Sequence, residues 1–304
     1  MKEATRVAAV FATMNRSETA RRCVESLAAQ TRPPERVIVA DNVSSDDTVA
    51  ILEDMRDLPF PLTVLKMAEN AGNAGGVRAA MELGFEEGAD AVWILDDDSW
   101  PRSDALAELL HKPLDPSVVR HSVQIDPKTG RFTWPMQIFD QAGKWVLVDR
   151  LEEIQDKQSI RTRIMWTGAL LPRQVRERIG PVNGDLFIRG EDEEYPWRIE
   201  QAGFTQEAAT RSILDHPGPE RLVEKQFLGK RLFFEPGLSD WKLYYKIRNM
   251  VWLKKQQSGM ISSLAMAAAY GLITSRIDGL RRIPLVIEAS IDGWRGRLGK
   301  WKKH

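Results

Sequence analysis

The chain has 304 residues, of which 43% are hydrophobic and 28% are charged, a composition that supports a large buried core and argues against global disorder. Its formal net charge is zero, which argues against a protein that binds nucleic acid over its whole surface. The single cysteine, Cys23, excludes an intramolecular disulfide and fits a reducing compartment. We expect no signal peptide, because the apolar run 7–12 is too short, and no stretch reaches the roughly 20 apolar residues of a membrane span.

The N-terminal third alternates between short apolar runs and helical patterns. Strands are predicted at 6–12, 36–40, 62–65 and 91–95, and helices at 17–28, 48–55 and 77–85. This alternation of strand and helix predicts a parallel sheet with right-handed crossovers.

The fourth predicted strand breaks directly into three carboxylates, Asp96-Asp97-Asp98. At the carboxyl end of a strand they would project into the crevice where open α/β sheets bind ligands. Three adjacent anions cost free energy unless a cation lies among them, and a divalent metal prefers oxygen ligands. The alternative is a solvated acidic turn.

Two further polar loops follow strands that end on the same predicted edge of the sheet. Thr13 to Arg16 leave the first strand, and Asp41-Asn42 leave the second. This is a nucleotide-binding arrangement. A glycine-rich loop, 70–76, precedes the third helix, and its residues Asn70 and Gly75 are candidates for a phosphate contact. A plain turn is the alternative.

The second half of the chain is less regular up to residue 165, where Trp134 and Trp145 either line a sugar-sized cleft or belong to the core. Four acids at 191–194 begin a helix, where they either cap its first turn or supply a general base. His216 follows a short strand and is a candidate metal ligand, with a structural role as the alternative.

The composition changes after about residue 220. Residues 241–253 predict an aromatic, basic helix, and 260–291 predict further helix with Arg276, Arg281 and Arg282 interspersed. Such helices are typical of a membrane interface, although packing on the catalytic domain or on a second subunit explains the same pattern. We therefore predict a catalytic domain at 1–220 and a basic, amphipathic helical region at 221–304.

The order of these motifs resembles the family 2 glycosyltransferases of GT-A fold, in particular their galactofuranosyltransferase and rhamnosyltransferase branch. The motifs are Thr13-x-Asn15-Arg16, Asp41-Asn42, the glycine loop, the three acids at 96–98, Gly190-Glu191-Asp192 and His216-Pro217-Gly218. The resemblance covers residues 6–255, more loosely in 102–165, and departs from the family's pattern at Met14 and Asn73. It implies a Rossmann-like, mostly parallel sheet flanked by helices, with a helical C-terminal extension.

The resemblance also implies roles for the donor-binding residues. Asp41 would contact the nucleotide base, with Thr13 and Arg16 against the same nucleotide. Asp97 would reach the ribose or the sugar of the donor. Trp166 would stack on a sugar face.

The catalytic and metal-binding roles are implied in the same way. Asp96, Asp98 and His216 would hold Mn²⁺ or Mg²⁺ on the donor diphosphate. Asp192 would be the base that deprotonates the acceptor hydroxyl, with Glu191 as the alternative, because a slip of one residue at a helix start changes which acid faces the cleft.

The activity implied is an inverting, metal-dependent transfer of galactofuranose from UDP-galactofuranose to a lipid-linked or cell-wall glycan. Rhamnose transfer from dTDP-rhamnose is the first alternative, and a non-catalytic sugar-nucleotide-binding protein is an alternative of another class. A nucleotidyltransferase is disfavoured, because the N-terminal region lacks the basic glycine-rich loop of that class. We expect a cytoplasmic protein, peripheral on the inner face of the plasma membrane, with no nucleic-acid partner; its oligomeric state stays open.

Overall fold

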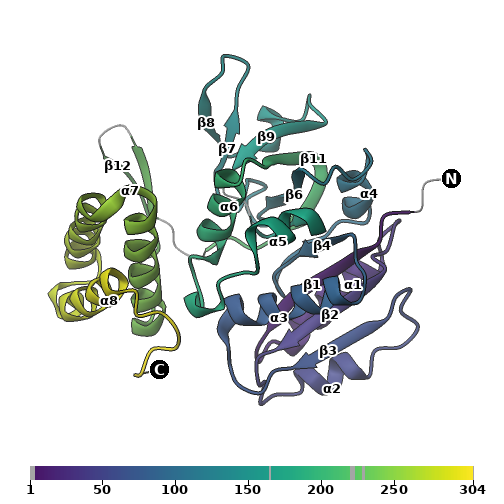
Figure 1. Ribbon diagram of the computed structural model, residues 1–304, viewed down its shortest axis with the longest axis horizontal. Coiled ribbons are helices and arrows are strands. Elements are labelled where there is room, and N and C mark those ends of the chain that lie inside the picture. Colours follow the sequence, from purple (N-terminus) through teal and green to yellow (C-terminus); the bar gives the residue numbers. More distant parts are fainter. Residues whose placement is uncertain (1–3, 164–165, 220–222, 228–229, 304) are drawn as a thin grey trace. The chain divides into compact units, whose positions relative to one another are not determined.

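A computed structural model describes residues 4–163, 166–219, 223–227 and 230–303 (Figure 1). The chain divides into two compact units, Met1–Asn183 with Asp192–Gly218, and Gly184–Glu191 with Pro219–His304. The short segment Gly184–Glu191 therefore belongs to the second unit although it lies inside the first in sequence. The domain boundary predicted near residue 220 stays a prediction.

The first four strands of the first unit pair in parallel, in the spatial order β3-β2-β1-β4. They are β1 (Val7–Thr13), β2 (Arg36–Asp41), β3 (Leu62–Lys66) and β4 (Ala91–Ile94), and the connecting helices are α1 (Ser17–Ala28), α2 (Thr48–Glu53) and α3 (Gly72–Glu86). All residues of β1 and β4 are buried, which explains their unbroken apolar runs. The parallel sheet predicted for this part of the chain is confirmed.

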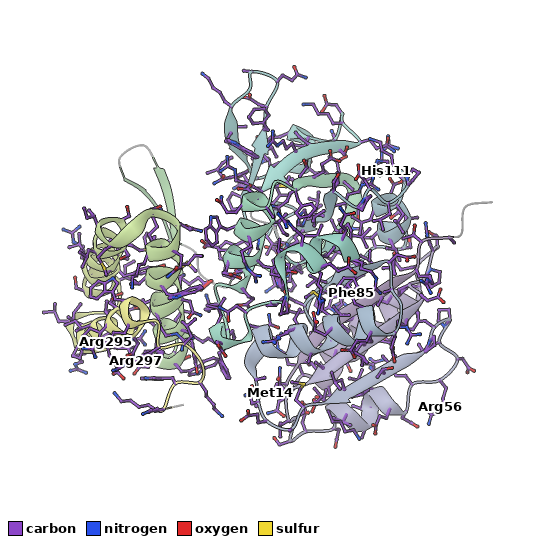
Figure 2. The ribbon with its side chains drawn as sticks, viewed as in Figure 1. Met14, Arg56, Phe85, His111, Arg295 and Arg297 are labelled. Carbon is purple, nitrogen blue, oxygen red and sulfur yellow. The ribbon has the colours of Figure 1, made fainter. Side chains whose placement is uncertain are left out.

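The sheet continues beyond β4 with mixed pairing. The remaining strands are β5 (Trp100–Pro101), β6 (Val118–Ile125), β7 (Met136–Phe139), β8 (Trp145–Val148), β9 (Ser159–Arg163), β10 (Ala169–Pro172) and β11 (Thr205–Asp215). β10 is antiparallel to both β4 and β6, and β11 runs parallel to β6. The helical elements of this part are α4 (Ala105–Leu109), η1 (Leu151–Glu153), α5 (Arg173–Ile179) and α6 (Glu191–Gln201). Figure 2 shows the side chains of the protein, with Phe85 of α3 inside the first unit and Arg56 at its surface.

The predicted glycine loop at 70–76 is mostly helix, because α3 begins at Gly72 rather than near Val77. Asn42, after β2, holds this start: its Oδ1 accepts the N–H of Ala71 at 3.2 Å and its Nδ2 donates to the carbonyl oxygen of Gly72 at 3.1 Å. A Cβ at Gly76 would lie 2.7 Å from the Cβ of Ala12, so this glycine lets α3 pack close to the sheet.

The second unit contains the hairpin β12 (Val223–Phe227) and β13 (Lys230–Phe234), with η2 (Gly184–Leu186), α7 (Asp240–Ile277), η3 (Leu280–Arg282) and α8 (Ile283–Arg295). Asn249 of α7 ties in the inserted segment, because its Nδ2 donates to the carbonyl oxygen of Leu186 at 2.9 Å. Phe187 stacks on Tyr245 with ring centroids 4.9 Å apart. The predicted helical C-terminal extension is confirmed.

Candidate functional site

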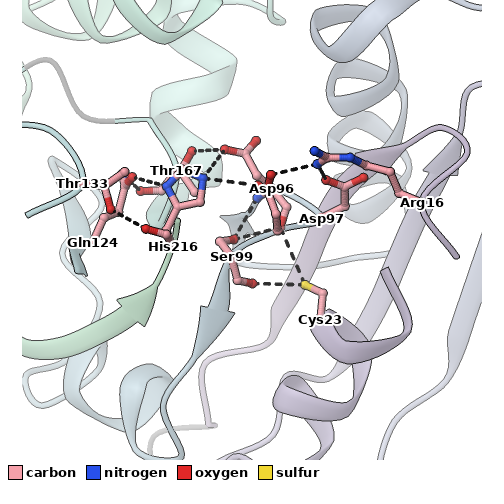
Figure 3. A network of polar contacts seen from close by, with 10 residues as sticks. Arg16, Cys23, Asp96, Asp97, Ser99, Gln124, Thr133, Thr167 and His216 are labelled. Carbon is pink, nitrogen blue, oxygen red and sulfur yellow. Dashed lines mark hydrogen bonds and ion pairs between the residues drawn. The ribbon is translucent and has the colours of Figure 1, made fainter. Parts of the chain in front are cut away.

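The parallel strands bring three polar loops to one edge of the sheet. Thr13, the last residue of β1, is the register partner of Asp41, the last residue of β2. The three carboxylates Asp96-Asp97-Asp98 follow β4, the neighbour of β1 on its other side. β11 ends at Asp215 and delivers His216 to the same place, 118 residues along the chain from Asp98 (Figure 3).

Two of the carboxylates and the histidine form a cluster that could hold a metal ion. One ligand atom from each of Asp96, Asp98 and His216 can be chosen so that all three lie within 4.8 Å of one another. His216 Nε2 is 3.2 Å from Asp98 Oδ1 and 3.9 Å from Asp96 Oδ2. Two carboxylate oxygens and an imidazole nitrogen suit a divalent ion such as Mn²⁺, so the donor set fits the predicted metal.

Polar residues around the cluster fix the orientation of its members. His216 Nδ1 lies 3.0 Å from Gln124 Oε1, and an N–H donated from Nδ1 to this oxygen would leave Nε2, which faces Asp98, as the nitrogen for a metal ion. Thr167 donates from its hydroxyl to Asp96 Oδ2 at 2.5 Å, and Thr133 donates to the carbonyl oxygen of His216 at 2.7 Å (Figure 3).

The sequence-based prediction missed Gln124, Thr133 and Thr167. Only Thr167 could have been identified from its sequence neighbours, because it lies between Trp166 and a glycine. Gly168 has φ 89°, and a Cβ there would lie 2.9 Å from Leu214 Cδ1. Glycine is therefore required beside the threonine that orients Asp96.

Asp97 and Arg16 form the other half of the carboxylate loop. Arg16 Nη1 lies 2.6 Å from Asp97 Oδ1 and 2.8 Å from Asp98 Oδ2, and Thr13 donates its hydroxyl proton to Asp97 Oδ2 at 2.8 Å. Asp97 is 6% exposed, and burial raises its pKa to about 6 although Arg16 opposes the shift. The guanidinium of Arg16 thus supplies the positive charge that three adjacent acids require.

The electrostatics of the cluster separate its two carboxylates. Burial raises the pKa of Asp96, and the charges of Asp98 and Asp192 add to the rise while His216 opposes it. Burial also raises the pKa of Asp98, but His216 and Arg16 outweigh it and lower that pKa to about 2. Burial lowers the pKa of His216, yet the hydrogen bond to Asp98 and the surrounding acids raise it overall. The charged forms of Asp98 and His216 therefore stabilise each other.

Asp41 occupies the place predicted for a base contact. It is 3% exposed, and its Oδ2 accepts the N–H of Ser44 at 3.0 Å. Within the described residues its buried Oδ1 has no hydrogen-bond partner and is available as an acceptor. Asn70 lies two residues before α3, where its Oδ1 accepts the N–H of Gly72 at 2.9 Å, and Gly75 is half-buried near the start of that helix.

The two candidate bases differ in exposure. Asp192 is exposed in the first turn of α6, and its charge contributes to the raised pKa of Asp96, so the two carboxylates interact within the first unit. Glu191 is 3% exposed and is grouped with the second unit. Trp166 is 6% exposed and packs edge-on against Tyr195, with ring centroids 5.6 Å apart; its predicted stacking on a sugar stays a prediction.

Comparison with known sequences matches residues 9–180 to the model of the family described as glycosyl transferase family 2. The chain is 25% identical over 259 residues to the galactofuranosyltransferase GlfT1 of Mycolicibacterium smegmatis, a match that covers 82% of this chain and 83% of that protein. It is 28% identical over 216 residues to the GlfT1 of Mycobacterium tuberculosis, covering 69% and 70% of the two chains.

Solved structures share the fold. A mannosyltransferase from Pyrobaculum calidifontis in complex with GDP-Man and Mn²⁺ matches 97% of this chain and 89% of its own, with a TM-score of 0.57 at 16% identity. TarS of S. aureus matches 96% of this chain with a TM-score of 0.59 at 15% identity, and GalNAc-T7 with UDP, GalNAc and Mn²⁺ matches 84% with 0.58 at 15%. This chain spans about half the length of the TarS and GalNAc-T7 chains, 49% and 48%.

Proposed function

The chain belongs to glycosyl transferase family 2 and is a glycosyltransferase, and we propose that it transfers galactofuranose from UDP-galactofuranose to a lipid-linked or cell-wall glycan. One observation carries the proposal: a half-buried cluster of two carboxylates and an imidazole lies at the carboxyl edge of the parallel strands, and the charge of an exposed acid, Asp192, contributes to the raised pKa of one of its members, Asp96. The choice of galactofuranose rests on the similarity to GlfT1, over 82% of the chain in the first of the two matches.

In the proposed complex the nucleotide lies along the ends of β1 and β2. Asp41 offers its free Oδ1 to a donor of the base, such as the ring N3–H of uracil. Thr13 and Arg16 line the same loop, and Asp97, which both already contact, reaches the ribose or the sugar. Asn70 and Gly75 present the start of α3 to the diphosphate, where the helix dipole favours an anion.

Asp96, Asp98 and His216 would hold the divalent ion, with Mn²⁺ preferred over Mg²⁺ because one ligand is an imidazole. When bound, such an ion neutralises negative charge on the nucleoside-diphosphate leaving group. Arg16 forms an ion pair with Oδ2 of Asp98, the oxygen that does not face His216, and adds positive charge beside the leaving group.

Asp192 is the proposed base. It accepts the proton of the acceptor hydroxyl as that oxygen forms a bond to the anomeric carbon. The bond between the anomeric carbon and the diphosphate oxygen breaks on the opposite face, and its electron pair leaves with UDP, so the configuration inverts. Asp192 is preferred to Glu191 because it is exposed and can reach an incoming acceptor, whereas Glu191 is 3% exposed. Trp166 would form one wall for the sugar ring.

A donor screen tests the proposal. The purified protein is incubated with UDP-galactofuranose or dTDP-rhamnose, each with Mn²⁺, with Mg²⁺ or with EDTA, and the released nucleoside diphosphate is measured. We expect UDP release that needs the metal. Release of dTDP instead would establish the rhamnosyl alternative. Binding of UDP-galactofuranose with no release of UDP under any condition would establish a non-catalytic binding protein.

A matched pair of variants tests the base in the same assay. Asp192→Asn should lose at least about a hundredfold in turnover, in the range of general-base catalysis, while Glu193→Gln, an exposed neighbour on the same turn, should stay near the wild-type rate. A loss in Glu191→Gln with an active Asp192→Asn would move the base by one residue.

A further inference from the structure

One face of the C-terminal half of α7 is both apolar and exposed. Residues 260–275 contain no charged side chain. Ile261 is 85% exposed, Leu264 47% and Leu272 54%. With the exposed Ala265 and Ala268 they recur at intervals of three and four residues, so they share one face of the helix, which we call the α7 stripe.

The opposite face of the same helix is packed inside the second unit. Ser263, Ala267 and Thr274 are buried. Trp294 of α8 donates from its indole N–H to Ser263 Oγ at 3.1 Å. This hydrogen bond and the packing of α7 on α8 orient the α7 stripe, whose own side chains contribute exposed apolar surface.

Contrary to the expectation that no stretch is apolar enough to span a membrane, α7 is long and apolar enough by length and composition, with a mean hydropathy of 1.3 over its most apolar 18 residues, of which 11% are buried. Gly259, with φ 79° and ψ 178°, breaks the helix, so the apolar half runs from Met260 to Ile277. A helix with one exposed apolar face and one face hydrogen-bonded to α8 is typical of a segment that lies along a membrane interface rather than across it.

Cations gather on the elements that follow. The basic residues after residue 280 are Arg281, Arg282, Arg295, Arg297, Lys300, Lys302 and Lys303, against two acids, Glu288 and Asp292. Both acids are already paired, Glu288 with Lys303 at 2.7 Å and Asp292 with Arg297 at 3.5 Å. Figure 2 shows Arg295 at the end of α8 and Arg297 in the segment that follows it, residues 296–303, which we call the tail.

The tail also borders a groove that combines both chemistries. The groove has a volume of about 980 Å³, and its lining combines Ile283, Ile287 and Ile291 of α8 with Lys300 and Lys302. Glu288 and Asp292, the two paired acids, also line it. Ile287 is 54% exposed. Apolar side chains beside lysine ammonium groups match the acyl chains and phosphates of an anionic lipid.

We propose that the second unit docks the protein on an anionic lipid bilayer, with the α7 stripe in the boundary between headgroups and acyl chains and the cations of α8 and the tail on lipid phosphates. The charge balance favours a bilayer over a second copy of this chain, because the surplus cations of one copy would repel those of the other. The docking rests on residues 260–303 alone, so it is independent of the donor and the base proposed for the first unit.

Vesicle sedimentation of the full-length protein tests the docking, with vesicles of phosphatidylcholine alone or mixed with phosphatidylglycerol. We expect binding to the anionic vesicles that is at least about tenfold tighter than to the neutral ones and that weakens with salt. The double variant Ile261→Glu with Leu272→Glu should bind at least about tenfold more weakly, because it places two charges on the buried face of the contact. Gln256→Glu with Gln257→Glu adds the same charge to exposed positions before the break and should stay within about threefold.

Equal binding by the two double variants would overturn the proposal. So would a stripe variant that turns a dimer into a monomer in solution, measured by light scattering, while its vesicle binding is unchanged.

A second measurement avoids any dependence on how the double variants fold. The only native cysteine, Cys23, is fully buried, and burial raises the pKa of its thiol, so an introduced cysteine can be labelled selectively. A polarity-sensitive dye on Leu264→Cys should shift to the blue with anionic vesicles, whereas the same dye on Gln256→Cys should shift little. Equal shifts at both positions, or none at Leu264→Cys, would contradict the docking.

Discussion

Thr167 offers the sharpest test of how the metal cluster is built. Its hydroxyl donates to Asp96 Oδ2 at 2.5 Å, and Thr167 itself is 6% exposed, so water does not readily replace the bond. Thr167→Val keeps the shape of the side chain and removes only the donor. The variant leaves a buried carboxylate oxygen without its hydrogen bond and frees Asp96 to rotate away from His216.

The size of the effect follows from this bond. A hydrogen bond to a charged group contributes about 1.5–3 kcal/mol. At about 1.4 kcal/mol for each factor of ten, that is roughly a ten- to hundredfold loss of metal affinity, the range typical of residues that orient a metal ligand. Removal of the bond also raises the pKa of Asp96 further, because the Thr167 hydrogen bond lowers it. The loss of affinity should therefore grow as the pH falls.

Calorimetric titration with Mn²⁺ measures this affinity without any donor or acceptor. Thr167→Ser retains the hydroxyl and is the matched control, which should bind within about threefold of the wild type. If Thr167→Val bound Mn²⁺ within twofold of the wild type at pH 7 and with an unchanged melting temperature, the hydrogen bond would not be orienting a metal ligand.

Three further predictions address other parts of the first unit. Burial lowers the pKa of His121 to about 3, below its value in the unfolded chain, so its contribution is fully present above about pH 6.5 and is lost as the pH falls toward 3. In urea titrations, the free energy of unfolding of the wild type should be about 2 kcal/mol lower at pH 5 than at neutral pH, and His121→Leu should not show this decrease. Parallel pH profiles of the two proteins would count against this. Gly168→Ala should lower the free energy of unfolding by about 2–4 kcal/mol, and Gly203→Ala by about 1 kcal/mol. Both glycines have φ above 80°, but only a Cβ at 168 would contact other atoms, so equal losses in the two variants would refute the contact. Asp41→Asn should weaken UDP binding about tenfold by calorimetry, and unchanged affinity would remove Asp41 from the base contact.

Local patterns predicted those elements that are determined by local burial. β1 and α1 lie within one residue of their predicted bounds, because an unbroken apolar run and a helical apolar stripe each specify one conformation. The start of α3 was wrong by five residues, since Asn42, about thirty residues earlier, draws the glycines of 72–76 into the helix. The antiparallel insertion of β10 between β4 and β6 is a long-range pairing that no local pattern encodes.

The candidate site divides in the same way. Asp96 and Asp98 follow directly from an apolar strand that ends in acids, and His216 from a strand end. Gln124 and Thr133 could not be identified, because each is an ordinary polar residue whose partner, His216, lies 92 or 83 residues away. Which of Glu191 and Asp192 can act as the base depends on which side of α6 faces solvent. The sequence does not determine this, whereas the packing of the helix buries Glu191 and exposes Asp192.

The central proposal is that Asp98 binds the metal ion and Asp192 deprotonates the acceptor hydroxyl. It is tested most directly by measuring donor binding and turnover together in Asp98→Ala and Asp192→Asn, with Mn²⁺ and UDP-galactofuranose. We predict that Asp98→Ala loses metal-dependent donor affinity and turnover together, while Asp192→Asn binds the donor nearly as the wild type does and turns over at least about a hundredfold more slowly. Loss of donor binding in Asp192→Asn equal to that in Asp98→Ala would contradict this division of roles.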